Sequence, residues 1–81
     1  PALHLLQLAA VAGREVAHAV LEAAVGPRLA DPLDEALAAK QLLEQGPGYR
    51  FRHPLYREAL YQGLSLARGA ALHGEVARAL E

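Results

Sequence analysis

The chain has 81 residues, of which 53% are hydrophobic and 21% charged, with a net charge of −1. These values are typical of one small globular domain and exclude a disordered segment, and the charge argues against a protein that coats nucleic acid. The absence of cysteine excludes disulfides and thiolate chemistry and fits a reducing compartment, so we expect a cytoplasmic protein. No apolar run is long enough to span a membrane, and no membrane partner is expected.

The first third of the chain predicts two helices. Ala2–Ala12 is apolar almost all round, which is typical of a helix buried on several sides. Gly13 ends this helix, and Arg14–Val16 is expected to be a short extended link. His18–Val25 predicts a second, shorter helix, which ends at the Gly-Pro pair that follows it.

A third helix and a hairpin are predicted next. Asp31 and Pro32 have the residue types of an N-cap and a first turn, so a helix is expected over Leu33–Leu43. After it, Leu42–Gln45 can pair with Tyr49–His53 across a Gly-Pro-Gly turn.

The stretch Tyr49–Tyr61 is the most informative part of the sequence. Tyr49, Phe51 and His53 alternate on one face of the predicted strand, with arginines on the other. Pro54 ends the strand and begins a helix, because it has no N–H to donate and suits a first turn. The expected apolar face of this helix consists of Leu55, Ala59, Leu60 and Leu64.

The predicted fold class is mostly α with a small β-hairpin: a winged helix of three helices plus a wing, followed by two C-terminal helices. Residues 1–66 are expected to form the winged-helix domain. Residues 67–81 are expected to form a helix that leads towards a following helical-repeat domain, with Leu72, Val76 and Leu80 on its apolar face. Because the chain starts without Met and ends within a helical pattern, we expect it to be part of a longer polypeptide.

Three runs resemble a known module: LLQLAAVAGREV, LDEALAAKQLLEQGPGYRFRHPLYREALYQGL and AALHGEVARALE. They are similar to the winged-helix module of STAND-class, AAA+-related NTPases. The most similar group is the large bacterial ATP-dependent transcriptional regulators of the LuxR-like and maltose-regulator-like type. In these proteins the module lies between the ATPase core and tetratricopeptide-type repeats, and the resemblance covers nearly the whole chain. The chain contains no P-loop, so an ATPase would lie upstream of Pro1.

The resemblance implies a role for His53. In STAND proteins the histidine of a Met-His-Asp motif at the strand-to-helix junction contacts the β-phosphate of ADP and holds a closed state. Arg52 stands in place of the Met and Pro54 in place of the Asp, so the chemistry of that carboxylate is not carried over. The implied ligand is ADP or ATP in the parent protein, and this fragment itself carries no cofactor. Arg50, Arg52 and Tyr56 are candidate neighbours or phosphate contacts.

His53 has a second interpretation as a histidine that merely ends a strand and bonds a nearby backbone carbonyl. His73 is expected to pack or cap locally on the last helix, and His4 and His18 belong to no motif. The four histidines lack metal-ligand spacing, so no metal site is expected. Ser65 is the only serine and no catalytic order is visible, so we expect no enzyme.

Two further function classes stay open. A winged helix can bind DNA through its third helix. Here that helix sets four acidic residues (Asp31, Asp34, Glu35 and Glu44) against Lys40, which argues against DNA, and Gln41 is its only side chain suited to base edges. The other class is a protein-interaction module: the first and last helices could dock the neighbouring NTPase and helical-repeat domains, and the same apolar surface would favour self-association.

Overall fold

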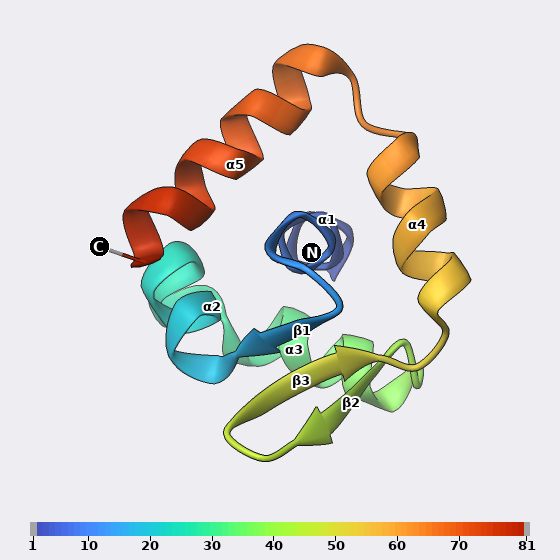
Figure 1. The fold of residues 1–81 in the computed structure, drawn as a ribbon. Helices are drawn as coiled ribbons and strands as arrows, with labels where there is room; N and C mark the ends of the chain where they lie inside the picture. The colour runs from blue at the N-terminus through green and yellow to red at the C-terminus, as the bar shows by residue number, and fades with distance from the viewer. Residues whose placement is uncertain (1, 81) are drawn as a thin grey trace.

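The computed structural model describes residues 2–80 and confirms a mostly helical fold with a small antiparallel sheet (Figure 1). In chain order the elements are α1 (Ala2–Ala12), β1 (Glu15–Ala17), α2 (His18–Val25), a 3₁₀ turn η1 (Gly26–Arg28), α3 (Ala30–Ala38), β2 (Leu42–Gln45), β3 (Gly48–Phe51), α4 (Pro54–Gln62) and α5 (Leu66–Leu80).

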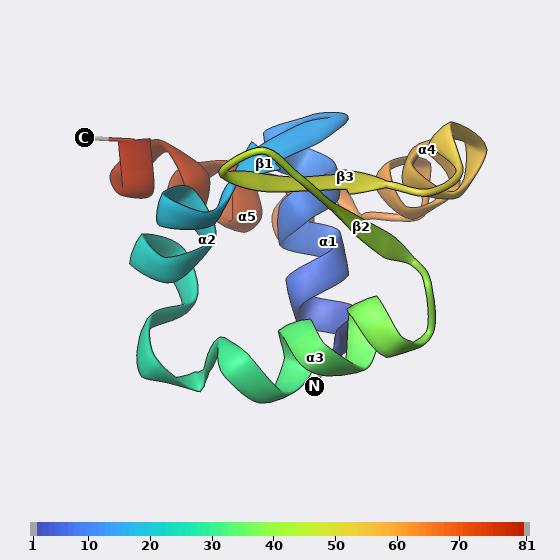
Figure 2. The same cartoon turned by 90° about the horizontal axis from the view of Figure 1, so that it is seen from below.

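Helix α1 is the centre of the molecule. Figure 1 looks down its axis, with the sheet and the other helices arranged around it, and Figure 2 shows it running from α3 towards the sheet. The prediction that this helix is buried on several sides is therefore confirmed. Among its leucines and its valine only Leu3 is exposed, at 58%. The other elements cover most of its apolar surface, and docking of this helix on a neighbouring domain stays a prediction. The buried residues of α1 are Leu5, Leu6, Leu8, Ala9, Ala10 and Val11.

The sheet has three strands in the order β1-β3-β2, all antiparallel. The predicted hairpin is confirmed as β2 and β3, but the segment expected to be a mere link forms the third strand, β1. Val16 lies opposite Tyr49, and Leu42 lies opposite Phe51. These four side chains are buried and form the core face of the sheet. The alternation predicted for Tyr49 and Phe51 is thus confirmed.

The predicted bounds of the third helix were wrong. Helix α3 begins at Ala30, so Asp31 lies in its first turn, and the N-cap position belongs to Leu29 without a side-chain hydrogen bond. The helix ends at Ala38 instead of Leu43, because Lys40 adopts a left-handed φ of 60° and turns the chain into β2. The helical periodicity of the sequence continues through this turn, but pairing with β3 determines the structure.

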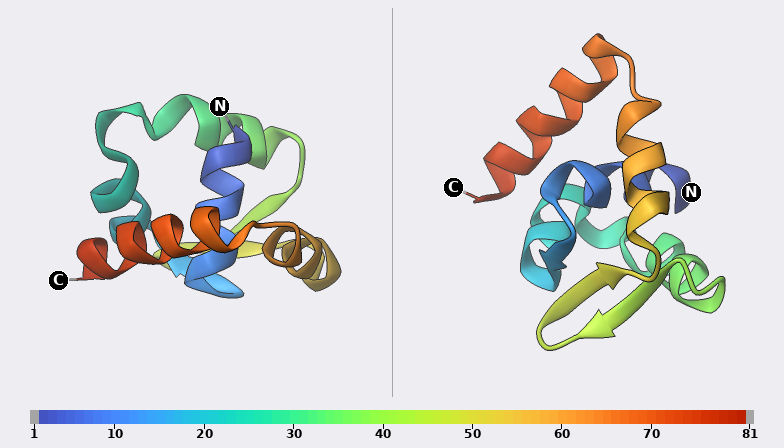
Figure 3. Two further views of the ribbon diagram at one scale, coloured as in Figure 1. Left: turned by 90° about the horizontal axis from the view of Figure 1, so that it is seen from above. Right: turned by 45° about the vertical axis from the view of Figure 1, so that its right-hand side comes forward.

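Helices α4 and α5 follow the sheet and meet at a tight turn, from which they diverge (Figure 3). Pro54 is the first residue of α4, as predicted. The apolar face expected there was partly wrong: Leu55 is 81% exposed, whereas Leu60 and Leu64 pack against the core together with Tyr56.

Helix α5 begins after Ser65, whose Oγ accepts a hydrogen bond from the backbone N–H of Arg68 at 3.0 Å, as an N-cap does. It packs against α1 and α2 and contributes Leu72 and Val76 to the core. Leu80, expected on the same apolar face, is 68% exposed. The boundary between residues 66 and 67 remains a prediction, although α5 shares one core with the preceding elements.

Candidate functional site

His53 lies at the junction of β3 and α4, in the N-cap position of the helix and in an extended conformation. Its side chain is exposed and makes no capping hydrogen bond, while its carbonyl oxygen accepts from the backbone N–H of Tyr56 at 3.0 Å. The expectation that His53 continues the face of Tyr49 and Phe51 is wrong, because β3 ends at Phe51 and the alternation ends with it. The imidazole is therefore available for contacts outside the domain.

The exposed imidazole borders a hollow of about 330 Å³, whose lining residues are Ala39, Lys40, Gln41, Arg52, His53 and Tyr56. Two of them, Lys40 and Arg52, are cationic and none is acidic. The backbone N–H of Arg52 donates to the carbonyl oxygen of Gln41 at 3.2 Å, and the Gln41 side chain donates to the Tyr56 hydroxyl at 3.3 Å. These bonds hold the turn after α3 against the segment that leads into α4. Residues of both segments line the hollow.

The structure brings Arg52, His53 and Tyr56 together, as the sequence suggested, and adds Lys40. The helical pattern of the sequence predicts Lys40 within the third helix, but its left-handed backbone places it after the helix, where it lines the hollow. Arg50 does not line the hollow: it is exposed on the outer face of the sheet, where it lies opposite Glu15 and Leu43.

His18 has a structural setting that the sequence did not indicate. Its Nδ1 is 2.7 Å from the hydroxyl of Tyr49, and its Nε2 is 3.6 Å from a carboxylate oxygen of Glu22. Burial raises the pKa of Tyr49, and the negative charges of Glu44 and Asp34 raise it further. The phenol therefore stays protonated at neutral pH and acts as a hydrogen-bonding group that joins α2 to the sheet.

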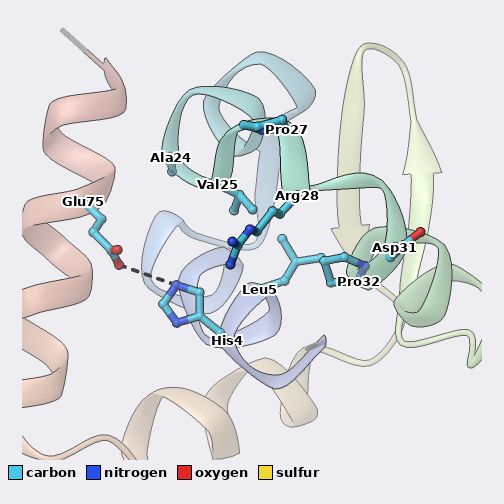
Figure 4. Close-up of a pocket in the computed structure, with 9 residues that line it drawn as sticks. All are labelled: His4, Leu5, Ala24, Val25, Pro27, Arg28, Asp31, Pro32 and Glu75. Carbon is cyan, nitrogen blue, oxygen red and sulfur yellow. Dashed lines mark ion pairs between the residues drawn. The ribbon is translucent and has the colours of Figure 1, made fainter.

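A second cluster surrounds His4, and no motif in the sequence indicates it. His4 lies in the first turn of α1, where its ring contacts the side chains of Arg68 and Glu75 on α5. Figure 4 shows the pair with Glu75. Arg68 and Glu75 are more than sixty residues away along the chain, so only the fold brings them to His4. By contrast, His73 packs locally as predicted: its Nε2 is 3.2 Å from the hydroxyl of Tyr61, and the two rings meet edge to face.

The electrostatics of α3 bear on the nucleic-acid interpretation. Asp31, Asp34 and Glu35 are exposed on this helix, and it carries no basic residue. Lys40 and Gln41, predicted within this helix, lie beyond its end. Within the described part of the chain, α3 therefore presents an acidic surface.

Among residues 2–80, no three His, Asp or Glu side chains are grouped closely enough to hold a metal ion. No helix of the same range has the length and apolar character needed to cross a membrane. Comparisons with protein-family models, curated proteins and solved structures find no match to the chain.

Proposed function

We propose that the chain is a winged-helix module of an ATP-dependent transcriptional regulator, and that it is not catalytic itself. The order of elements supports this proposal: three helices precede a hairpin, and two helices follow it. The module would act through contacts with the NTPase and helical-repeat domains of the same polypeptide, and these contacts would couple the nucleotide state to the arrangement of the domains.

The observation that carries this proposal is the exposed imidazole of His53, which makes no side-chain capping hydrogen bond and borders a hollow with two cationic residues and no acidic residue. An imidazole N–H can donate a hydrogen bond to a phosphate oxygen. Lys40 and Arg52 would add favourable charge around the same phosphate. A contact made with ADP but not with ATP would favour one domain arrangement over the other, because a ligand shifts an equilibrium only by its differential affinity.

DNA binding is the alternative, and the surface of α3 argues against it. A third helix that enters the major groove lies close to two phosphate strands, and the exposed Asp31, Asp34 and Glu35 would be repelled there. Arg50 and Arg52 on and beside the wing could each contact one phosphate. Such contacts position a protein on DNA without reading its sequence.

The deciding experiment measures retention of ADP by the full-length protein, with His53→Ala compared against wild type. His73→Ala is the matched control, because that histidine is also exposed but lies on α5 with Tyr61. We expect His53→Ala to weaken ADP binding by about ten-fold, the loss of one hydrogen bond to a charged group, and His73→Ala to leave it unchanged.

A second arm titrates the 81-residue chain with duplex DNA at low and high salt. We expect no binding. Unchanged ADP affinity in His53→Ala, together with salt-sensitive binding of DNA by the chain, would contradict the proposal and assign the wing to nucleic acid.

A further inference from the structure

Another hollow of the described structure measures about 690 Å³, within the usual size range of small-molecule pockets. It is bounded by α1, α2, η1, α3 and α5 and shares no residue with the hollow beside His53 (Figure 4). An inference drawn from it is therefore independent of the proposed nucleotide contact.

Part of the lining is apolar. Leu5 of α1 belongs to the lining but is only 1% exposed, so the accessible apolar surface comes from Ala24, Val25, Pro27 and Pro32. An aliphatic group placed against these side chains would leave water, at a gain of about 25 cal/mol for each Å² of apolar surface buried.

The polar groups of the lining are placed unevenly. Figure 4 shows the guanidinium of Arg28 pointing into the hollow towards His4 and Glu75, whereas the carboxylate of Asp31 points away from them. Among residues 2–80, Arg28 forms no ion pair with any carboxylate. Its planar set of N–H donors is suited to a carboxylate, which it can bind through two parallel hydrogen bonds.

The contacts of His4 fix which of its nitrogens carries the proton. Arg68 Nη2 is 2.6 Å from His4 Nδ1, and a guanidinium can only donate, so Nδ1 accepts and the proton of the neutral ring is on Nε2. His4 Nε2 is 3.9 Å from Glu75 Oε2, which is too long for a hydrogen bond. Within residues 2–80, this N–H donor and the Glu75 carboxylate therefore both keep hydrogen-bonding capacity at the edge of the hollow.

We propose that this hollow binds a small zwitterion with an aliphatic body, of the class of the apolar amino acids. The ligand carboxylate is bound by Arg28 and by the Nε2–H of His4, and the ligand ammonium by Glu75. The aliphatic side chain lies against the partly exposed Val25 and Pro32. The arrangement selects against ligands of a single charge. A plain carboxylate meets the unneutralised Glu75, and a plain amine meets Arg28.

The test is an amide-resolved NMR titration of the 81-residue chain with L-leucine, isocaproate and isoamylamine, which share an aliphatic body but differ in charge. At about 10 mM ligand, a Kd of about 1 mM would give near-saturating shifts. We expect L-leucine to shift the amides around residues 4–5, 24–28 and 75, and the two singly charged compounds to bind at least about ten-fold more weakly.

Variants make the test specific. Arg28→Gln should weaken the binding of L-leucine by about ten-fold or more, whereas the control Arg14→Gln, at the opposite end of α1, should leave it unchanged. Glu75→Gln should weaken the binding of L-leucine, because its ammonium loses the carboxylate partner. The same variant should strengthen the binding of isocaproate, because the charge that repels its carboxylate is gone. Circular dichroism checks that each variant is folded.

The proposal is overturned by any of three results. These are the absence of shifts at those residues, equal affinity of wild type for isocaproate and L-leucine, or an equal loss of affinity in Arg28→Gln and Arg14→Gln.

Discussion

The substitution Gly48→Ala tests the part of the fold that the sequence did not reveal, the pairing of β1 with β3. Gly48 lies on the central strand, opposite Ala17 on β1 and Gln45 on β2. A Cβ atom at this position would lie 2.2 Å from the carbonyl oxygen of Val16 and 2.8 Å from the Cα of Ala17. Both are backbone atoms, so no side-chain rotation can relieve the contact, and β1 itself would have to move.

The cost follows from that displacement. Overpacking a well-packed site costs about 1–3 kcal/mol, and a lost backbone hydrogen bond about 1 kcal/mol more. We therefore expect Gly48→Ala to lower the free energy of unfolding by about 2–4 kcal/mol. A domain of this size has roughly 4–12 kcal/mol in total. The corresponding decrease in Tm is about 10 °C or more.

Gly69→Ala in α5 is the matched control, because the same substitution there should raise the free energy of unfolding instead of lowering it. No heavy atom lies within 4 Å of the Cβ it would add, and its φ is an ordinary helical value. Alanine in a helix interior is favoured over glycine by about 0.5–1 kcal/mol, so this variant should be more stable than wild type.

Thermal and urea unfolding followed by far-UV circular dichroism measures both variants. If the free energy of unfolding of Gly48→Ala lies within about 0.5 kcal/mol of the wild-type value, the register of β1 on β3 is wrong.

Two further predictions concern the junction and the core face of the sheet. Phe51 is 4% exposed and meets Tyr56 edge to face, so Phe51→Ala should cost about 3–5 kcal/mol in urea unfolding. The exposed His53→Ala should change stability by less than about 0.5 kcal/mol, and an equal loss in both variants would make His53 a core residue. The pKa of Tyr49 is raised above its ordinary 10.0, chiefly by burial and then by Glu44 and Asp34. Its stabilising contribution is therefore complete below that value and is lost as the pH rises through the folded-state pKa. Urea midpoints measured from about pH 9 to pH 11 should fall more steeply in wild type than in Tyr49→Phe, and parallel curves would contradict this assignment.

Local signals in the sequence were sufficient for much of the fold. The bounds of α1 and α2, the hairpin and the start of α4 at Pro54 all follow from short patterns of apolar residues, glycine and proline. Strand β1 could not be found in this way, because three residues carry too little periodicity and their partner strand is more than thirty residues away. The end of α3 was predicted wrongly for a related reason. The helical pattern of the sequence continues to Leu43, but the pairing of β2 with β3 outweighs it.

The candidate sites divide along the same line. His53 could be found because its motif is contiguous, from Phe51 to Tyr61, and the structure adds Ala39, Lys40 and Gln41 to its surroundings. The hollow around His4 could not be found, since Arg28 and Glu75 reach it from elements distant in the chain. Charged residues that meet only through tertiary packing show no characteristic spacing in the sequence.

The packing around α1 limits how the proposed switch can operate. Near one end of this helix, the side chain of Arg57 on α4 donates to the carbonyl oxygen of Ala10 at 2.9 Å. Near the other end, His4 accepts from Arg68 on α5. Leu72 and Val76 bind the middle of α5 to the same core. Because both helices after the sheet are held to α1, a change at the His53 hollow cannot release α4 alone without breaking the Arg57 hydrogen bond and the packing of the partly buried Tyr56 and Leu60. We therefore expect a nucleotide-dependent change to move the module as one rigid body against its neighbouring domains, as in hinge-type transitions, with little rearrangement inside it.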